Sequence, residues 1–198
     1  MLYPFNFGRG AVAAAALALA ACSNSTAPTT TSRASLVNDP ANDFIPSFTG
    51  AHTADLDVRS MEVSYNGTNY HFTGTMAGNA GSTLGSFYVW GVNRGAGTAR
   101  FGSIATNVLF DFVVIVNPAG GSSVRDFITG VATPLPPTAV SFTGPRIDVD
   151  VPASLMPAQG FAADAYTTNL WPRTGLASSS QIADFAPDNS NAPVRRIP

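Results

Sequence analysis

The chain of 198 residues contains no lysine, one cysteine and two histidines, and only 11% of its residues are charged. Its ten arginines stand against twelve acidic residues and form no basic stripe of the kind that binds a phosphate backbone. We therefore expect no nucleic-acid partner. A single cysteine cannot form an internal disulfide. No apolar run reaches the roughly 20 residues that a membrane-spanning helix requires.

The single cysteine, Cys22, stands at the end of an apolar run, 11–21, that follows Arg9. A charged start, a short apolar run and small residues are typical of a signal peptide. The tetrapeptide Leu19-Ala20-Ala21-Cys22 resembles the bacterial lipobox, which implies a signal peptide over 1–21 and a lipid-modified Cys22 as the mature first residue. The resemblance also implies a cell-envelope location, and Ser23 after the cysteine favours the outer membrane if the organism has one. The alternative is an ordinary secretory signal, whose cleavage site also requires small residues.

The next segment, 22–43, is rich in Ser, Thr, Pro and Asn and almost free of large apolar residues. A segment of this composition buries too little apolar surface to offset the entropy that it would lose on ordering. It therefore predicts a flexible tether behind the lipid anchor. One folded domain is expected over 44–193, followed by a short tail over 194–198.

The domain has the pattern of an all-β protein. Alternating apolar and polar residues flank Asn66-Gly67, which predicts a β-hairpin, and 146–151 alternates in the same way. The segments 86–92 and 107–116 are apolar on nearly both faces, as central strands of a two-layer core are. Only 152–156 offers a turn of helix. These features predict a single antiparallel β-sandwich, jelly-roll or immunoglobulin-like.

The order of these segments over about 55–160 resembles that of DOMON-like and family-nine carbohydrate-binding sandwiches. The resemblance rests on the hairpin, on "LFDFVVIV", and on "RIDVDVPASLM", in which acids alternate before a proline turn. It implies a binding module. Domains of the DOMON type can hold haem through methionine and histidine, but Met61 and Met76 fall on inward faces, where core packing is the expected role.

Two loops carry oxygen ligands that suit calcium. Asp55 and Asp57 precede the first long strand, and Asp184 and Asp188 lie in the loop "DFAPDNSNAP". Hard cations such as Ca²⁺ take six to eight oxygens, which carboxylates and loop carbonyls supply. The alternative is that these acids form Asx turns and solvated loops.

The segment around Trp171 contains a candidate ligand site. Trp171 and Arg173 would form a stacking platform for a sugar, with Asp184 and Asn189 binding hydroxyl groups. The alternative places Trp171 in the core and ties Arg173 to Asp184 or Asp188 as a structural clamp.

Two functions from different classes remain. The first is an envelope lipoprotein that presents a binding module for a glycan or another cell-surface ligand. The second is a structural lipoprotein that docks to envelope proteins and has no small-molecule site. No nucleophile, base and acid occur at a spacing that indicates catalysis, so we do not expect an enzyme.

Overall fold

A computed structural model describes Met1 and residues 35–198, and it confirms the all-β sandwich. The first sheet has the order β1-β2-β3-β11-β10, with β14 on β2: β1 (Val37–Asn38), β2 (Val58–Tyr65), β3 (Asn69–Met76), β10 (Val140–Thr143), β11 (Arg146–Pro152) and β14 (Arg195–Arg196). The second has the order β13-β12-β4-β7-β8-β9: β4 (Phe87–Asn93), β7 (Phe112–Val116), β8 (Ser123–Asp126), β9 (Ala132–Pro134), β12 (Thr167–Arg173) and β13 (Ala192–Pro193).

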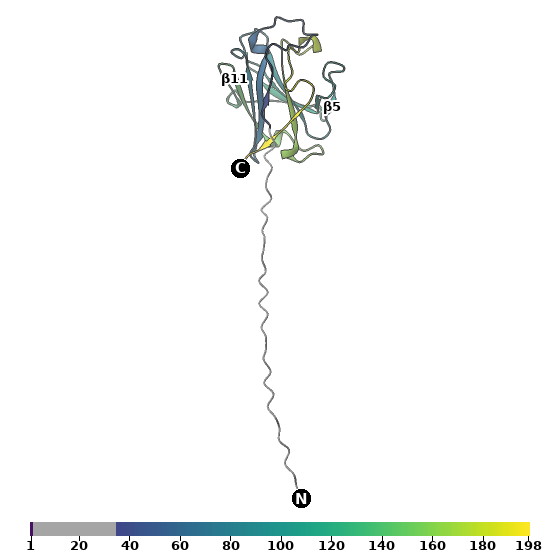
Figure 1. The fold of residues 1–198 in the computed structure, drawn as a ribbon. Coiled ribbons are helices and arrows are strands. Elements are labelled where there is room, and N and C mark those ends of the chain that lie inside the picture. The colour runs from purple at the N-terminus through teal and green to yellow at the C-terminus, as the bar shows by residue number, and fades with distance from the viewer. Residues whose placement is uncertain (2–34) are drawn as a thin grey trace. The chain divides into compact units, whose positions relative to one another are not determined.

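A small third sheet pairs β5 (Thr98–Ala99) with β6 (Leu109–Phe110). The remaining regular elements are single 3₁₀ turns: η1 (Ala54–Leu56), η2 (Pro137–Ala139), η3 (Ala153–Leu155), η4 (Ala163–Ala165) and η5 (Ser179–Gln181). Figure 1 shows β11 and β5 on opposite sides of the fold. Within residues 35–198, all strand pairs are antiparallel except β14 with β2.

The hairpin at Asn66-Gly67 forms between β2 and β3 as predicted. Only Gly67 has a positive φ, +92°, so the turn differs from the type I′ form in which both central residues do. The side-chain oxygen of Asn66 instead accepts the backbone N–H groups of Thr68 and Asn69, at 3.0 and 2.8 Å. The asparagine therefore stabilises the turn through its side chain.

The main core lies between the two sheets. The first sheet contributes alternate residues of β2, β3 and β11, and the second contributes alternate residues of β4 and β7. Buried side chains from the first sheet include Met61, Phe72 and Val149, and those from the second include Trp90 and Val114. Met61 and Met76 are both among them, in keeping with core packing.

The second sheet is also apolar on its outer face. Val89, Val113 and Trp171 alternate with the inward residues of their strands and pack in a separate cluster with Phe110 and Phe185. The segment that contains β5 and β6, together with residues around 182–185, covers this face. This explains why 86–92 and 107–116 are apolar on both faces: β4 and β7 are central strands with packed layers on both sides.

The folded part is longer at both ends than the predicted domain, 44–193. β1 pairs with β2 through Val37↔Met61 and Asn38↔Ser60, inside the segment predicted as tether. β14 pairs with β2 inside the predicted tail. These strands have two residues each, too short to produce a readable alternation.

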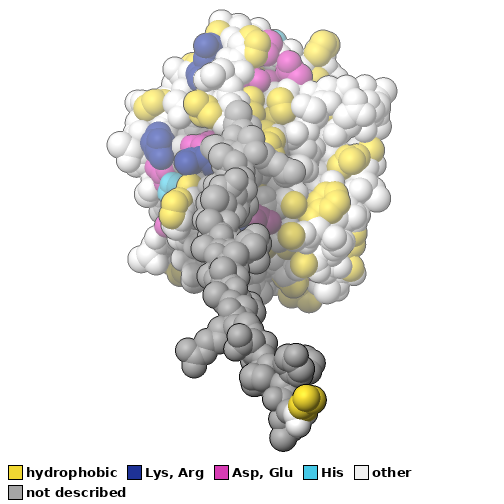
Figure 2. Space-filling model, turned by 60° about the horizontal axis from the view of Figure 1, so that its bottom comes forward, with side chains coloured by type: hydrophobic (Ala, Val, Ile, Leu, Met, Phe, Trp, Pro, Cys, Tyr) yellow, Lys and Arg dark blue, Asp and Glu magenta, His cyan; other side chains and the backbone are white. Residues whose placement is uncertain are grey.

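Charged side chains are sparse on the surface. On the face seen in Figure 2 they lie mostly on one side of the molecule, and the other side shows hydrophobic groups scattered among uncharged ones. Within the described residues, no helix has the length and hydropathy to span a membrane.

Candidate functional site

Five aspartates from three separate segments form an acidic cluster, which we define as Asp39, Asp43, Asp57, Asp184 and Asp188. One carboxylate oxygen each from Asp39, Asp43 and Asp188 lies within 4.8 Å of the other two, and the same holds for Asp43, Asp57 and Asp184. The structure thus brings together three of the four acids considered for calcium. It adds two that the sequence analysis placed in the tether.

The fourth predicted calcium residue, Asp55, lies apart from the acidic cluster. Its carboxylate accepts the backbone N–H and the hydroxyl of Thr83, at 2.8 and 2.6 Å, and the hydroxyl of Tyr88 at 3.4 Å. Burial raises the pKa of Asp55, but the hydrogen bonds from Thr83 outweigh this and lower it below its usual value. Asp55 belongs to the single turn η1, whereas Asp57 follows it in extended backbone, so the two side chains meet different neighbours.

Mutual repulsion and burial perturb the acidic cluster. Burial, followed by the charges of Asp184 and Asp43, raises the pKa of Asp39 to about 8. Burial also raises the pKa of Asp184 to about 7, in spite of a hydrogen bond from the backbone of Val58. Among the described residues, no arginine or histidine forms an ion pair with any member of the cluster.

Trp171 is not an exposed stacking platform. Its side chain is 2% exposed and contacts Phe101, Phe110 and Phe185, with ring centroids 4.9 to 6.0 Å away. The cause is Gly91, the neighbouring position on the same face of β4. A Cβ at Gly91 would overlap the indole, so the absence of a side chain there leaves the space that the ring occupies.

Trp171 and Arg173 nevertheless line a cavity of about 250 Å³ on the outer face of the second sheet. We call it the aromatic pocket. Its lining consists of Val89, Phe101, Phe110, Val113, Ile115, Arg125, Phe127, Trp171, Arg173 and Leu176. The lining residues come from β4, β7, β8 and β12 and from the segments that cover them.

The polar residues predicted beside Trp171 lie elsewhere. Asp184 belongs to the acidic cluster, and the side-chain oxygen of Asn189 accepts the backbone N–H of Asn107 at 3.0 Å. Arg173 does not pair with Asp184 or Asp188. It donates to the carbonyls of Gly175 and Ser178, and burial lowers its pKa. The structure thus brings Trp171 and Arg173 together and does not place Asp184 or Asn189 beside them in the pocket.

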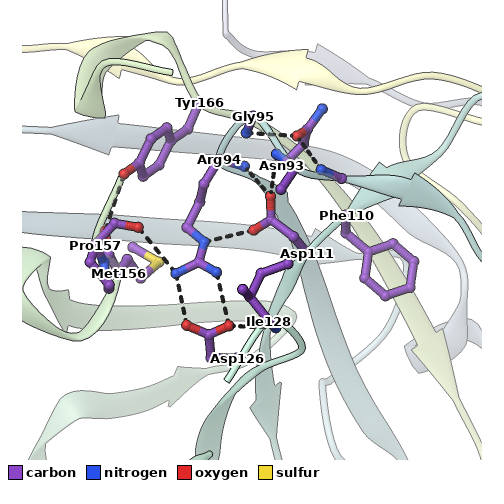
Figure 3. A network of polar contacts seen from close by, with 12 residues as sticks. Asn93, Arg94, Gly95, Phe110, Asp111, Asp126, Ile128, Met156, Pro157 and Tyr166 are labelled. Atoms are coloured by element: carbon purple, nitrogen blue, oxygen red, sulfur yellow. Dashed lines mark hydrogen bonds and ion pairs between the residues drawn. The ribbon is translucent and has the colours of Figure 1, made fainter. Parts of the chain in front are cut away.

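A buried ion network holds the segment that covers the pocket (Figure 3). Arg94 Nε donates to Asp111 Oδ1 at 2.6 Å, and its two terminal nitrogens donate to the carboxylate of Asp126 at 3.1 and 3.0 Å. Nη1 also donates to the carbonyl of Pro157. Asp111 in turn accepts the backbone N–H groups of Arg94 and Ala96. The network fixes both ends of the segment between β4 and β7, which carries Phe101 and Phe110.

The two histidines occupy structural positions. His71 lies on the outer face of the first sheet between Asp150, at 2.8 Å, and Asp148, at 3.1 Å. The His52 ring stacks on Phe44, with centroids 4.3 Å apart. Each histidine is thus engaged away from the methionines of the core.

Asp39 and Asp43 are the functional candidates that sequence reasoning missed. They stand in "NDPANDF", at the end of the stretch rich in Ser, Thr, Pro and Asn. Phe44 and Ile45, which directly follow, were the available sign that ordered structure begins there. Cys22, the predicted lipidation site, lies outside the described residues.

Comparison with protein families, with curated proteins and with solved structures finds no match to this chain.

Proposed function

We propose that the protein is a lipid-anchored binding module of a bacterial cell envelope, and that its ligand occupies the aromatic pocket. The anchor is argued from Leu19-Ala20-Ala21-Cys22 and the apolar run before it. The likeness of the strand pattern to carbohydrate-binding and DOMON-like sandwiches favours a binding role over a purely structural one.

The observation that carries the ligand proposal is a set of arginines without acidic partners around an apolar cavity. Arg125 and Arg173 line the pocket, and Arg100 lies next to it, with its guanidinium 4.5 Å from the ring centroid of Phe127. Within the described part of the chain, none of these three arginines forms an ion pair. Of the five other described arginines, those at 94, 146, 195 and 196 pair with carboxylates, and Arg59 forms no ion pair.

This arrangement fits an amphipathic ligand with an apolar body and an anionic group. Aliphatic and aromatic walls remove apolar surface from water, while guanidinium groups bind a carboxylate or phosphate through charge-assisted hydrogen bonds. A neutral sugar would require convergent carboxylates or amides for its hydroxyls, and the lining includes neither. An anionic ligand is therefore favoured over a neutral glycan.

Binding is tested with a soluble form of residues 23–198. Anilinonaphthalene sulfonate, which has an aromatic body and an anionic group, should fluoresce on binding, and laurate should displace it better than dodecanol. Arg125→Gln should weaken binding about tenfold, as the loss of one charged hydrogen bond would. Arg146→Gln, an exposed arginine of the other sheet, is the matched control and should leave binding unchanged.

Two results would decide against the proposal. Failure of the sulfonate and laurate to bind would favour the structural lipoprotein that docks to envelope proteins. Retention on a neutral polysaccharide, with no response to laurate, would favour a glycan ligand. Mass spectrometry of the mature amino terminus tests the anchor separately, since a diacylglyceryl group on Cys22 is expected and an unmodified thiol there would exclude it.

A further inference from the structure

The acidic cluster joins segments far apart in the chain. Asp39 and Asp43 come from the loop after β1, Asp57 lies between η1 and β2, and Asp184 and Asp188 belong to the loop after β12. Asp43 is common to both groups of oxygens that lie within 4.8 Å of one another. Two Ca²⁺–oxygen bonds of about 2.4 Å place their oxygens at most about 4.8 Å apart, so each group has the size of a coordination sphere.

Buried carboxylate oxygens in this cluster have no protein partner. Asp39 is 6% exposed and Asp57 is 3% exposed. Asp39 Oδ2, Asp57 Oδ1 and Asp43 Oδ1 are inaccessible to solvent and have no hydrogen-bond partner among the described residues. Burying an ionised oxygen without a partner is costly, and buried charges normally pair or coordinate metals. These oxygens are therefore available to coordinate a cation, which would compensate their buried charge.

Backbone groups hold the carboxylates in place. The N–H of Asn42, whose φ is +61°, donates to Asp57 Oδ2 at 2.9 Å. The N–H groups of Val58 and Phe185 donate to the two oxygens of Asp184, at 2.8 and 2.7 Å. Asp57 keeps its second oxygen free. The site is thus oriented by the fold before any ion binds.

We propose that the acidic cluster is a calcium site in which Asp43 is shared by two overlapping sets of ligands, one completed by Asp39 and Asp188 and the other by Asp57 and Asp184. Oxygen ligands alone suit a hard cation, and Zn²⁺ would favour histidine or cysteine. Ca²⁺ accepts many carboxylates in irregular geometry, whereas Mg²⁺ keeps most of its water and binds one or two. Loop carbonyls and water would complete the sphere. This site goes beyond the proposed function and does not depend on a ligand in the aromatic pocket.

The test uses the mature, acylated protein in detergent. Its thermal midpoint is measured with CaCl₂, with MgCl₂ and with EDTA, and its bound calcium is measured by elemental analysis after gel filtration. Calcium at a hundredfold excess over its dissociation constant should raise the midpoint by about 5–10 °C above that in EDTA. Equal midpoints in calcium and EDTA without retained calcium would overturn the proposal, and an equal response to magnesium would overturn the choice of calcium.

Variants separate the metal from general stability. Asp43→Asn should abolish the calcium response, while its midpoint in EDTA should equal or exceed that of the wild type because one repelling charge is gone. Asp188→Asn, in an exposed loop, should reduce the response and serves if Asp43→Asn does not fold. Asp150→Asn, whose side chain is 66% exposed on β11, makes the same charge change and should keep the full response. A full calcium response in Asp43→Asn, or in Asp188→Asn where Asp43→Asn does not fold, would refute the site.

Discussion

Removal of Arg94 tests how the covering segment of the second sheet is held. The side chains of Arg94 and Asp111 are fully buried, and Asp126 is nearly so. In Arg94→Leu both carboxylates lose their cation, and Asp111 remains inside the protein with only backbone donors. Removing one member of a buried ion pair typically costs about 3–5 kcal/mol, because the remaining charge is uncompensated.

For a domain of this size, about 1 kcal/mol corresponds to roughly 2–4 °C, so the thermal midpoint should fall by about 6–20 °C. Urea unfolding followed by circular dichroism measures the free energy directly. The double variant Arg94→Leu/Asp111→Asn should be more stable than Arg94→Leu, because it also removes the buried Asp111 charge that the single variant leaves without a cation.

Arg146→Leu is the matched control, since Arg146 pairs with Asp148 at 2.6 Å on the exposed face of the first sheet. An exposed pair contributes at most about 1 kcal/mol. Two results would contradict a stabilising role of the buried network: a loss of unfolding free energy in Arg94→Leu no larger than in Arg146→Leu, or no gain in unfolding free energy in the double variant over Arg94→Leu.

Three further changes follow from the same contacts. Gly91→Val should displace the indole of Trp171, costing about 1–3 kcal/mol by overpacking and reducing dye binding in the pocket; an unchanged unfolding curve and dye affinity would contradict this. Burial raises the pKa of Asp126, but the hydrogen bonds from Arg94 and nearby backbone outweigh it and lower the pKa, so this stabilisation is present above about pH 4 and is lost on further acidification. The wild type should therefore lose more stability than Asp126→Asn between about pH 5 and pH 2, measured by urea unfolding; equal losses would argue against it. Asp55→Asn should cost about 1–3 kcal/mol through its lost hydrogen bonds and leave the calcium shift of the midpoint intact, whereas loss of that shift would place Asp55 in the metal site.

The regular strands could be predicted because their alternation is local. The β2–β3 hairpin and β11 each show apolar residues at every second position, and burial of one face produces that pattern directly. The apolar residues on both faces of β4 and β7 predict central strands, and both strands are central in the second sheet. The layer that covers the outer face of β4 and β7 forms around Phe110 and Trp171. It could not be predicted, because it depends on packing between distant segments.

The acidic cluster could be predicted only in part for a similar reason. Asp184 and Asp188 stand close in sequence, but their neighbours Asp39 and Asp43 lie more than 140 positions away in a stretch that looks like a linker. The composition of a stretch of about 20 residues does not reveal the two-residue strand β1, with which the fold begins there. The burial of Trp171 was equally out of reach, because it depends on a glycine of another strand.

The first and last strands of the described domain, β1 and β14, both pair with β2. Of the described residues, those nearest to Cys22 in sequence that contact the sandwich are Ser35, whose hydroxyl donates to Glu62, and β1, whose pairing covers two residues. If Cys22 carries a lipid, a pull from the membrane acts on these contacts. The next side chain along the chain, Asp39, belongs to the acidic cluster. A bound ion would therefore strengthen this end of the domain against a pull. It would connect the loop after β1 to Asp57, which directly precedes β2, and to the distant loop at 184–188.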